Sequence, residues 1–345
     1  MSGTSLDGVD LAFCQFKEEN STLSYKILFT KAIPYSSEWL DRLQNLTNSS
    51  AREYVAADNA YGKYLGKMIK SFTNEIGIKA DYIASHGHTI FHEPTLGYTA
   101  QIGNPNAIYA QCEIPVIADF RSLDVQYGGT GAPLVPIGDQ LLFANYICVN
   151  LGGIANLSYF NEGKSTAYDI SPFNLLLNHI ARKKGFPYDK DGQIALKGSI
   201  NKLLLDQLNN CPYYDKSLPK SLDKSWVEDY FFPIIDGFEI SLEDKQRTII
   251  EHLIQQIDIS LQESYSITGQ KVFFTGGGTH NKFFIDLLQQ KAKYEIELPS
   301  KEIIDFKEAL IFAFLAYRKL QNKHNVLAEV TGARKNVSGG VFVGE

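Results

Sequence analysis

Three glycine-rich segments of the sequence combine a flexible backbone with small polar side chains. The first consists of Gly3, Thr4, Ser5, Leu6, Asp7, Gly8, Val9 and Asp10. Glycines let backbone N–H groups approach an anion closely, and the Thr4 and Ser5 hydroxyls add donors, so this segment is a candidate phosphate site. Asp7 is a weak candidate for holding a metal ion through a water molecule. The alternative is an ordinary capped turn, because turns use the same residue types.

The second segment lies where a predicted strand runs into paired glycines. Its candidate residues are Asn150, Gly152 and Gly153. The glycines again allow a phosphate to approach the backbone. The alternative is a hairpin turn or a β-bulge, and for this segment taken singly we favour the alternative.

The third segment connects a predicted strand to a helix. Its candidate residues are Gly276, Gly277, Gly278 and Asn281. Three glycines would let a flat ligand, such as a nucleotide base or ribose, lie against the chain; the alternative is a strained strand-to-helix turn. Neither the G-x-G-x-x-G nor the P-loop pattern occurs. Three such turns together indicate an ATP-dependent phosphotransferase with a hinged cleft.

Asp169 is the carboxylate best placed for chemistry. It lies near the end of a predicted strand and shortly before a helix, which is where open α/β sheets place reactive groups. There it would act as a general base; the alternative is an N-cap for the following helix. Arg121 and Asp124 form another constellation, in which Arg121 would clamp an anionic or polyhydroxyl substrate. The alternative for this pair is a surface ion pair.

Three of the seven histidines, His86, His88 and His92, lie in one short segment that ends in Glu93-Pro94. Clusters of His and Glu bind zinc, so a metal-dependent hydrolase is a second hypothesis. The H-E-x-x-H pattern is absent. We therefore favour a role for these side chains in lining a sugar site or in hydrogen bonds within the domain.

The elements that must position these residues are strands alternating with helices, a pattern that predicts an α/β fold. The predicted strands are 9–17, 23–34, 82–85, 98–102, 116–118, 146–151, 157–160, 166–170 and 272–275. The predicted helices are 52–75, 174–184, 240–265, one from about 281, and 306–320, and Asn104-Pro105 is typical of a helix start. The segment 211–233 is the least regular and is a candidate substrate loop or insertion.

The length of 345 residues predicts roughly two domains at ~150 residues each. The glycine cluster Gly128–Gly131 marks a boundary, because the pattern of strands restarts after it. We expect an N-terminal lobe over 1–127, joined by the C-terminal segment 325–345. The C-terminal lobe is expected over 128–324 and would carry the two later glycine turns.

Composition excludes several classes of protein. Lys and Arg total 33 and Asp and Glu 39, so the net charge is −6, which argues against a general nucleic-acid binder. There is no apolar run of about 18 residues and no signal-like start, so we expect no membrane partner. The cysteines Cys14, Cys112, Cys148 and Cys211 form no C-x-x-C pair, which indicates reduced thiols and a cytoplasmic protein. The sequence leaves a homodimer open.

Together these motifs resemble the anhydro-N-acetylmuramic acid kinase family. The matching segments, in family order from Met1 to about Gly332, are MSGTSLDGVD, SHGHTIFHEP, QIGNP, ADFRSLDV, GGTGAPLVP, NLGGIANLS, YDISPFN, FTGGGTHN and EVTGA. The resemblance implies the two-domain α/β fold of the sugar-kinase/actin-like ATPase superfamily, with an ATP cleft between the lobes. It implies ATP and Mg²⁺ as cofactors and a sugar as the partner substrate.

The reaction that the resemblance implies is the opening of 1,6-anhydro-N-acetylmuramic acid by water at C1, while O6 takes the γ-phosphoryl group of ATP. Asp169 corresponds to the family's catalytic base in its D-x-G-P-x-N motif, and the glycine turns correspond to its nucleotide contacts. Asp7 would approach Mg²⁺. The residues implied to lie on the substrate side are His86, Thr89, Arg121, Asp124, Asn174 and Glu308.

The sequence departs from the family pattern at three points. Family members carry a short hydrophobic strand before the first motif, whereas Met1 begins at that motif here. Ser171 stands where the D-x-G-P-x-N motif has glycine. The family's P-K-S-T/L-G-R-E segment is P-K-S-L-D-K-S from Pro219 to Ser225. These departures motivate a third hypothesis, a degenerate member that binds sugar or nucleotide as a sensor.

Overall fold

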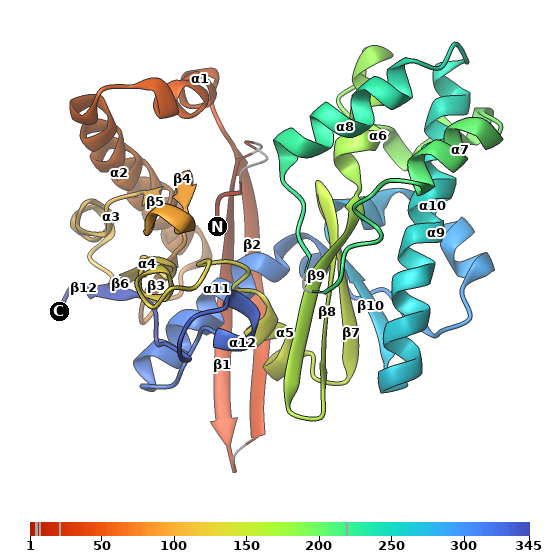
Figure 1. Ribbon diagram of the computed structural model, residues 1–345. Coiled ribbons are helices and arrows are strands. Elements are labelled where there is room, and N and C mark those ends of the chain that lie inside the picture. The colour runs from red at the N-terminus through yellow and green to blue at the C-terminus, as the bar shows by residue number, and fades with distance from the viewer. Residues whose placement is uncertain (4–5, 7, 21, 219) are drawn as a thin grey trace. The chain divides into compact units, whose positions relative to one another are not determined.

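The computed structural model describes residues 1–345 apart from 4–5, 7, 21 and 219 (Figure 1). The chain forms two compact units, one made of 1–142 with 306–345 and the other of 143–305. Each unit contains both helices and strands, so the α/β class expected from the sequence is confirmed. In the part of the chain that is described, no helix is long and apolar enough to cross a membrane.

A sheet with the strand order β11-β10-β7-β8-β9 forms the centre of the second unit. Its strands are β7 (Tyr146–Leu151), β8 (Ile154–Asn161), β9 (Lys164–Pro172), β10 (Lys271–Thr275) and β11 (Ile296–Glu297). β7, β8 and β9 are joined as an antiparallel meander, whereas β10 pairs parallel with β7 and with β11. Because β8 alone runs in the opposite direction, the carboxyl ends of β7, β9 and β10 lie at one edge of the sheet.

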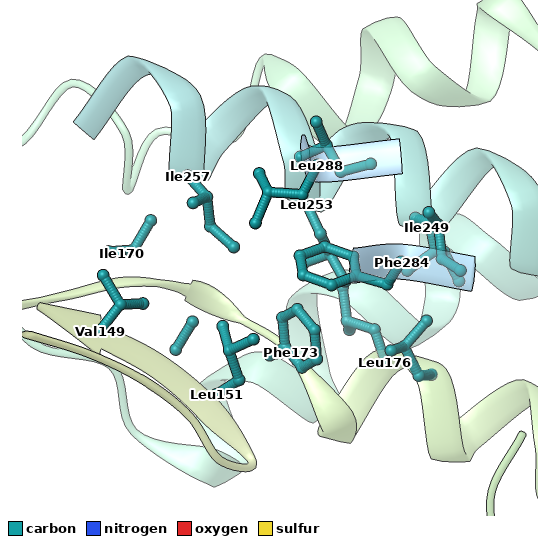
Figure 2. Close-up of a cluster of buried hydrophobic side chains, with 14 of the residues drawn as sticks. Val149, Leu151, Ile170, Phe173, Leu176, Ile249, Leu253, Ile257, Phe284 and Leu288 are labelled. Carbon is teal, nitrogen blue, oxygen red and sulfur yellow. The ribbon is translucent and has the colours of Figure 1, made fainter. Parts of the chain in front are cut away.

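Helices bury the apolar side chains of this sheet. The helices of the second unit are α6 (Asn174–Lys183), α7 (Lys202–Asn209), α8 (Lys224–Asp236), α9 (Leu242–Thr268) and α10 (Lys282–Lys291). Figure 2 shows side chains of β7, β9, α6, α9 and α10 meeting in one cluster. Phe173 and Phe284 meet edge to face there, with ring centroids 4.9 Å apart. Burying each such side chain contributes about 1.5–3 kcal/mol.

The first unit is built from smaller sheets. Its strands are β1 (Gly8–Glu19), β2 (Thr22–Pro34), β3 (Ile83–Ser85), β4 (His88–Glu93), β5 (Tyr98–Ile102), β6 (Val116–Ala118) and β12 (Val341–Val343). They pair as a β1-β2 hairpin, a β12-β6-β3 sheet and a β4-β5 hairpin. Its helices are α1 (Ser37–Asn45), α2 (Ala51–Ile76), α3 (Pro105–Cys112), α4 (Ser122–Gln126), α5 (Pro136–Leu142), α11 (Lys301–Leu320, from Phe306 onward) and α12 (Ala328–Thr331).

A cavity of about 550 Å³ lies between β1 and β3. Residues of both strands line it, together with apolar side chains of α2 and α11 such as Leu65 and Phe312. At one end the Met1 ammonium donates to the Asp10 carbonyl at 2.7 Å, and the Asp10 N–H donates to the Met1 carbonyl at 2.8 Å. Burial lowers the pKa of this ammonium. Met1 therefore lies antiparallel to the start of β1, in the wall of the cavity.

The limits of the units differ from the expected 127/128 and 324/325. They fall at 142/143 and 305/306 because α5 and most of α11 pack within the first unit. Ile137 of α5 and Ile311 and Phe312 of α11 share one buried cluster with Ile117 and Phe120. The packing of apolar side chains sets these limits, and the glycine cluster at 128–131 does not mark where that packing changes.

The expectation that 211–233 is irregular is wrong for its second half, which belongs to α8. Asp223 begins this helix as an N-cap, and its side chain accepts from the backbone N–H of Ser225 at 2.8 Å. Pro233 lies inside the helix. The proline and the tyrosines of this segment conceal a helix whose start depends on a cap.

A buried ion pair joins α11 to α5 within the first unit. Lys307 Nζ lies 2.7 Å from Asp139 Oδ1, and the two side chains are only 6% and 8% exposed. Two charges withdrawn from water in this way depend strongly on each other. The pair therefore fixes the packing of α11 against α5 more than it adds net stability.

We predict that Lys307→Met destabilises the protein by about 3–5 kcal/mol, because the change leaves the Asp139 carboxylate buried without this cation. Adding Asp139→Leu should recover most of the loss, since both charges are then gone. Urea unfolding measures each free energy. Lys301→Met is the control: this α11 lysine pairs with Asp305 but is 77% exposed, so its loss should cost under ~1 kcal/mol. Equal losses in Lys307→Met and the double variant would contradict the prediction.

Candidate active site

Strand pairing in the second unit places four polar residues in one row across the sheet. Asp169 lies opposite Asn156, Asn156 opposite Asn150, and Asn150 opposite Thr275. Neighbouring strands lie about 4.8 Å apart, so Asp169 is roughly 10 Å from Asn150. The glycine turns after β7 and β10 begin directly beyond this row. The sheet thus brings the predicted base and two of the predicted phosphate turns to one edge.

Asp169 is half-buried and held by a loop. The Leu222 N–H donates to its carboxylate Oδ2 at 2.8 Å, its own N–H donates to the Lys220 carbonyl at 3.1 Å, and the Tyr213 hydroxyl donates to its carbonyl. Burial raises the pKa of Asp169 above the ordinary aspartate value, and the Leu222 N–H partly opposes this. A carboxylate with a raised pKa is a better proton acceptor.

The N-cap alternative for Asp169 is wrong. The cap position of α6 is Phe173, without a side-chain cap bond, and Asp169 lies within β9. Gly152 and Gly153 form the hairpin turn between β7 and β8, which was the alternative favoured for them. This turn also meets α6, since the N–H groups of Phe173 and Asn174 donate to the Gly153 and Gly152 carbonyls. The Asn174 side chain donates to the Leu151 carbonyl at 3.2 Å.

The turn after β10 allows a close backbone approach. Gly276 has φ +86°, and a Cβ there would lie 2.5 Å from Asn150 Oδ1. A Cβ on Gly278 would lie 2.4 Å from the Phe173 ring, whereas one on Gly277 would meet nothing within 4 Å. Asn281 ends the turn by capping α10, with its Oδ1 accepting from the Phe284 N–H at 3.1 Å. Gly277 is thus the exposed member of a turn whose other glycines are packed.

In the first unit, His86 and Arg121 contact each other. Arg121 Nε and Nη2 lie 3.0 and 2.9 Å from His86 Nε2, and Arg121 Nη1 donates to the Gly131 carbonyl at 2.7 Å. A guanidinium only donates, so Nε2 accepts and the ring proton is on Nδ1, which lies 3.0 Å from the Gly87 carbonyl. Burial, aided by the Arg121 charge, lowers the pKa of His86 and keeps it neutral. Glu308 is exposed, and its charge acts on Arg121.

The other residues predicted on the substrate side differ in their environments. Thr89 on β4 accepts from the Gln101 side chain of β5 at 3.3 Å. Asp124 is fully buried, and its two carboxylate oxygens accept from the Thr331 hydroxyl and the Gly131 N–H, both at 2.8 Å. Asp124 thus holds the 128–131 loop in place. Its burial contradicts the alternative of a surface ion pair with Arg121, and the predicted sugar contact of Asp124 stays a prediction.

Part of the first glycine segment lies outside the described residues, namely Thr4, Ser5 and Asp7. Gly3, Leu6, Gly8, Val9 and Asp10 are described. The Val9 side chain is in the core of the first unit, and Gly8 packs so closely that a Cβ would lie 2.3 Å from the Ile33 carbonyl oxygen. Gly8 and Val9 would therefore contact a phosphate only through their backbone.

The three clustered histidines are engaged in separate hydrogen bonds. His86 Nε2 faces Arg121, His88 Nδ1 lies 2.8 Å from the Ser2 hydroxyl, and His92 Nδ1 lies 3.0 Å from the Thr99 hydroxyl. Within the described residues, no group of three or more His, Cys, Asp or Glu side chains could hold a metal ion. The hydrogen bonds within the domain that we favoured for these histidines are present.

Sequence reasoning missed the residues that hold Asp169. Tyr213, Lys220 and Leu222 lie about fifty residues beyond it along the chain, and no local pattern connects them to β9. Asn156, its neighbour in the row, was part of a quoted motif but received no role. The one usable signal was the lack of a regular pattern over 211–233, which made this segment a candidate substrate loop or insertion.

Comparisons with known proteins show the family to which the chain belongs. The family described as anhydro-N-acetylmuramic acid kinase matches residues 1–344. The chain belongs to this family. The anhydro-N-acetylmuramic acid kinase of Sulfurimonas denitrificans is 30% identical and covers 99% of this chain and 98% of its own. That of Shewanella sp. (strain MR-4) is 36% identical and covers 99% of this chain and 97% of its own.

Members of the anhydro-N-acetylmuramic acid kinase family are phosphotransferases, so the chain is an enzyme of this class and the expected family is confirmed. The two units, each of which contains helices and strands, agree with the two-domain α/β fold that was expected for this family. The metal hydrolase and the sensor are not favoured. One solved structure, an activator of 2-hydroxyisocaproyl-CoA dehydratase from Clostridium difficile with bound ADPNP, covers 90% of this chain and 96% of its own at 10% identity and a TM-score of 0.43. This likeness is too weak to support an inference.

We predict that Gly278→Ala destabilises the protein by about 1–3 kcal/mol, because the added methyl group would overlap the Phe173 ring and the Leu151 side chain. The matched control is Gly277→Ala in the same turn, where the methyl group meets nothing within 4 Å. That change should alter the free energy of unfolding by under ~0.5 kcal/mol. Urea unfolding compares the two variants, and equal losses would refute the close packing described for Gly278.

Asp169→Asn should stabilise the folded protein at neutral pH. Burial raises the pKa of Asp169 in the folded state, so its ionisation opposes folding above that pKa. The advantage of asparagine should shrink as the pH falls through the folded pKa, because the wild-type carboxyl then takes up a proton. Thermal unfolding as a function of pH measures the difference. The control is Asp229→Asn at an exposed position of α8, where no stabilisation is expected.

Proposed function

We propose that this chain is an ATP-dependent kinase that opens 1,6-anhydro-N-acetylmuramic acid with water and phosphorylates O6. The product would be N-acetylmuramic acid 6-phosphate, an intermediate of cell-wall recycling. The observation that carries the proposal is the row from Asp169 to Thr275, which puts a partly buried carboxylate at the same sheet edge as two glycine turns. This arrangement suits a reaction that needs one base and a phosphoryl donor.

In the proposed reaction Asp169 takes a proton from the attacking water. The water oxygen bonds to C1, the C1–O6 bond breaks, and O6 bonds to the γ-phosphorus as the bond to the β-phosphate oxygen of ATP breaks. A glycosidase normally needs a second carboxyl to protonate the leaving oxygen. Here phosphorus accepts that oxygen instead, so one carboxylate is enough. The Leu222 N–H would hold Asp169 in a fixed orientation toward the water.

The nucleotide is proposed to lie against the backbone of the glycine turns. Gly277 is exposed with open space around it, as a site for the base or ribose requires. The turn at 152–153 and the segment 3–10 would offer backbone donors to the phosphates. Mg²⁺ usually keeps several waters and binds substrate phosphates with one or two carboxylates, and we propose that Asp7, which lies outside the described residues, would hold it through a water molecule. Bound Mg²⁺ would neutralise charge on the phosphates.

The sugar is proposed to meet the first unit near His86 and Arg121. The guanidinium of Arg121 carries more N–H donors than its bonds to His86 and Gly131 use, so it can also bind the lactyl carboxylate of the sugar. Thr89, Asn174 and Glu308 stay as proposed contacts. The described cysteines are free thiols, which supports a reducing, cytoplasmic compartment. A homodimer stays a prediction.

We predict that Asp169→Asn lowers turnover by ~10²-fold or more while ATP still binds, because the amide cannot take the proton from water. Wild-type activity should fall as the pH drops through the raised pKa of Asp169. A coupled assay with the anhydro sugar and ATP measures turnover, and a nucleotide titration measures binding. In ¹⁸O-labelled water the label should appear at C1 of the sugar.

Two outcomes would contradict this function. Near-wild-type turnover in Asp169→Asn would remove the assigned base. Label in inorganic phosphate instead of the sugar would indicate a plain ATPase. The exposed variant Asp229→Asn serves as the control, since a carboxylate on the outer surface of α8 should not affect turnover.

A further inference from the structure

A chain of short hydrogen bonds begins at Ser171, two residues after Asp169. The Ser171 hydroxyl lies 2.9 Å from the Tyr214 hydroxyl, and that hydroxyl lies 2.8 Å from His252 Nε2. On the other side of the ring, His252 Nδ1 lies 2.7 Å from Asn209 Oδ1. The chain thus connects β9, the segment after Cys211, α9 and the end of α7. Ser171 is the residue that stands where the family motif has glycine.

Which group donates in each hydrogen bond follows from the orientation of the Asn209 amide. Asn209 Nδ2 donates to Gln255 Oε1 at 2.8 Å, and Asn209 Oδ1 accepts from Gln256 Nε2 at 3.0 Å. Asn209 Oδ1 is thus an acceptor, and His252 Nδ1 must carry the proton. The ring is buried, which lowers the pKa of His252 to about 3, so Nε2 has no proton and accepts from Tyr214. The Tyr214 oxygen then accepts from Ser171, whose hydroxyl lies 2.9 Å from it and farther, at 3.3 Å, from the Pro172 carbonyl.

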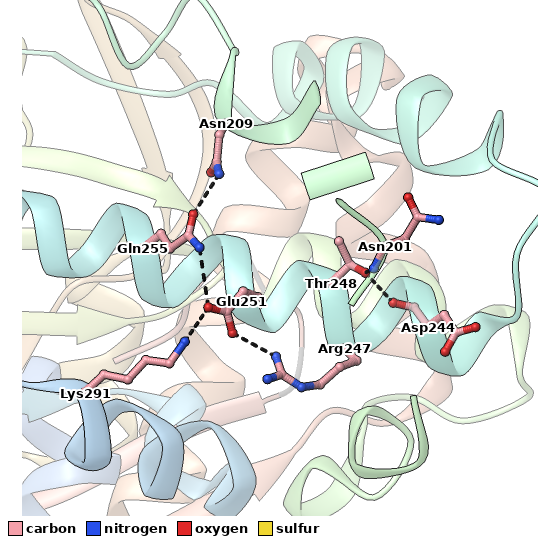
Figure 3. Close-up of polar contacts among 8 residues, drawn as sticks. All are labelled: Asn201, Asn209, Asp244, Arg247, Thr248, Glu251, Gln255 and Lys291. Atoms are coloured by element: carbon pink, nitrogen blue, oxygen red, sulfur yellow. Dashed lines mark hydrogen bonds and ion pairs between the residues drawn. The ribbon is translucent and has the colours of Figure 1, made fainter. Parts of the chain in front are cut away.

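At its other end, this series of hydrogen bonds reaches the charged side chain of Glu251, as Figure 3 shows. Gln255 Nε2 donates to Glu251 at 3.4 Å, and this buried carboxylate pairs with Lys291 of α10 and with Arg247 Nη1, the latter at 3.1 Å. Each donor from Ser171 onward therefore points toward one anion. Buried networks in which every member is satisfied are rigid, because each broken bond leaves an unpaired polar group.

Tyr214 belongs to the same segment that holds Asp169. Its neighbour Tyr213 donates to the Asp169 carbonyl, and Lys220 Nζ donates to the Tyr214 carbonyl at 3.1 Å. Leu222, near the end of this segment, donates to the Asp169 carboxylate. The described residues of the segment from Cys211 to Asp223 form no helix or strand, so its position depends on individual bonds such as those to Asp169. The bond from Tyr214 to His252 joins this segment to α9.

We propose that Tyr214 and His252 are positioning residues, which hold the segment 211–223 on β9 so that the Leu222 N–H stays on the Asp169 carboxylate. Ser171 supplies the first donor of this chain, and α9, fixed by Glu251, supplies the support. The inference rests on the proposed function only for the role of Asp169 as base. The placing of Leu222 by Tyr214 and His252 is a separate property of the fold.

The test compares Tyr214→Phe, which removes one hydroxyl, with His252→Leu, which removes both ring nitrogens at a similar volume. Tyr294→Phe is the matched control, since it removes the hydroxyl of another buried tyrosine in the same core, on the α10–β11 connection. Hydrogen exchange of the Leu222 amide, measured by NMR, reports the bond to Asp169 without any substrate. Carboxyl ¹³C NMR, assigned with Asp169→Asn, follows the titration of Asp169.

We expect the Leu222 amide to exchange at least tenfold faster in Tyr214→Phe and in His252→Leu, and the pKa of Asp169 to rise because a bond that lowers it is lost. With the anhydro sugar and ATP, kcat should fall about tenfold at an unchanged KM for ATP, and the acid limb of the pH profile should move to higher pH. Tyr294→Phe should change none of these.

Unchanged exchange at Leu222 in both variants would overturn the proposal, and so would an equal change in Tyr294→Phe. A loss of stability with Leu222 exchange and Asp169 titration unaltered would also overturn it, since that result indicates a merely structural role. If the wild-type protein forms no product from the anhydro sugar and ATP, the proposed function fails. The exchange and titration measurements still decide whether Tyr214 and His252 position the segment.

Discussion

The register of the central sheet in the second unit is the constraint on which the site depends. The strands from β10 to β9 follow the order β10-β7-β8-β9. If two neighbouring strands of this series were shifted by one residue, Asp169, Asn150 or Thr275 would point to the opposite face of the sheet. The register between β8 and β9 shifts once, between Ala155 and Asn156. This places Asp169 opposite Asn156 and Ser171 opposite Ala155, with Ile170 as the extra residue. A bulge of this kind re-aims side chains, and it lies next to the carboxylate that we assign as base.

Asp169 combines two requirements that normally conflict. Burial makes the carboxylate a stronger proton acceptor, but burial without partners would favour its neutral form too far. The hydrogen bond from the Leu222 N–H opposes this effect, but it requires that the backbone at Leu222 be held in place. The supporting segment is irregular, and its side chains lead to a buried ion-pair network on α9. Contacts on α9 and α10 thus affect the pKa of Asp169, although Asp169 lies on β9.

Local patterns predicted the elements well, and long-range contacts account for what they missed. β7 has the predicted limits, and α3 begins at the predicted Asn104 cap with Pro105 as its first residue. These features depend on hydrophobic alternation and on capping, which are readable over a few residues. The bond from Leu222 to Asp169 spans 53 residues, and the bond from Thr331 to Asp124 spans 207. No local pattern encodes such pairs, so the bonds by which Asp124 holds Thr331 and Gly131 were not predicted.

The cavity between β1 and β3 has a practical consequence for handling the protein. Within the described residues, β1 and β3 border this cavity, and each is an edge strand of its sheet. Strand edges that border such a space also attract strands of other chains, which leads to aggregation. Low protein concentrations therefore suit work with this protein, because they limit pairing between these strand edges on different molecules.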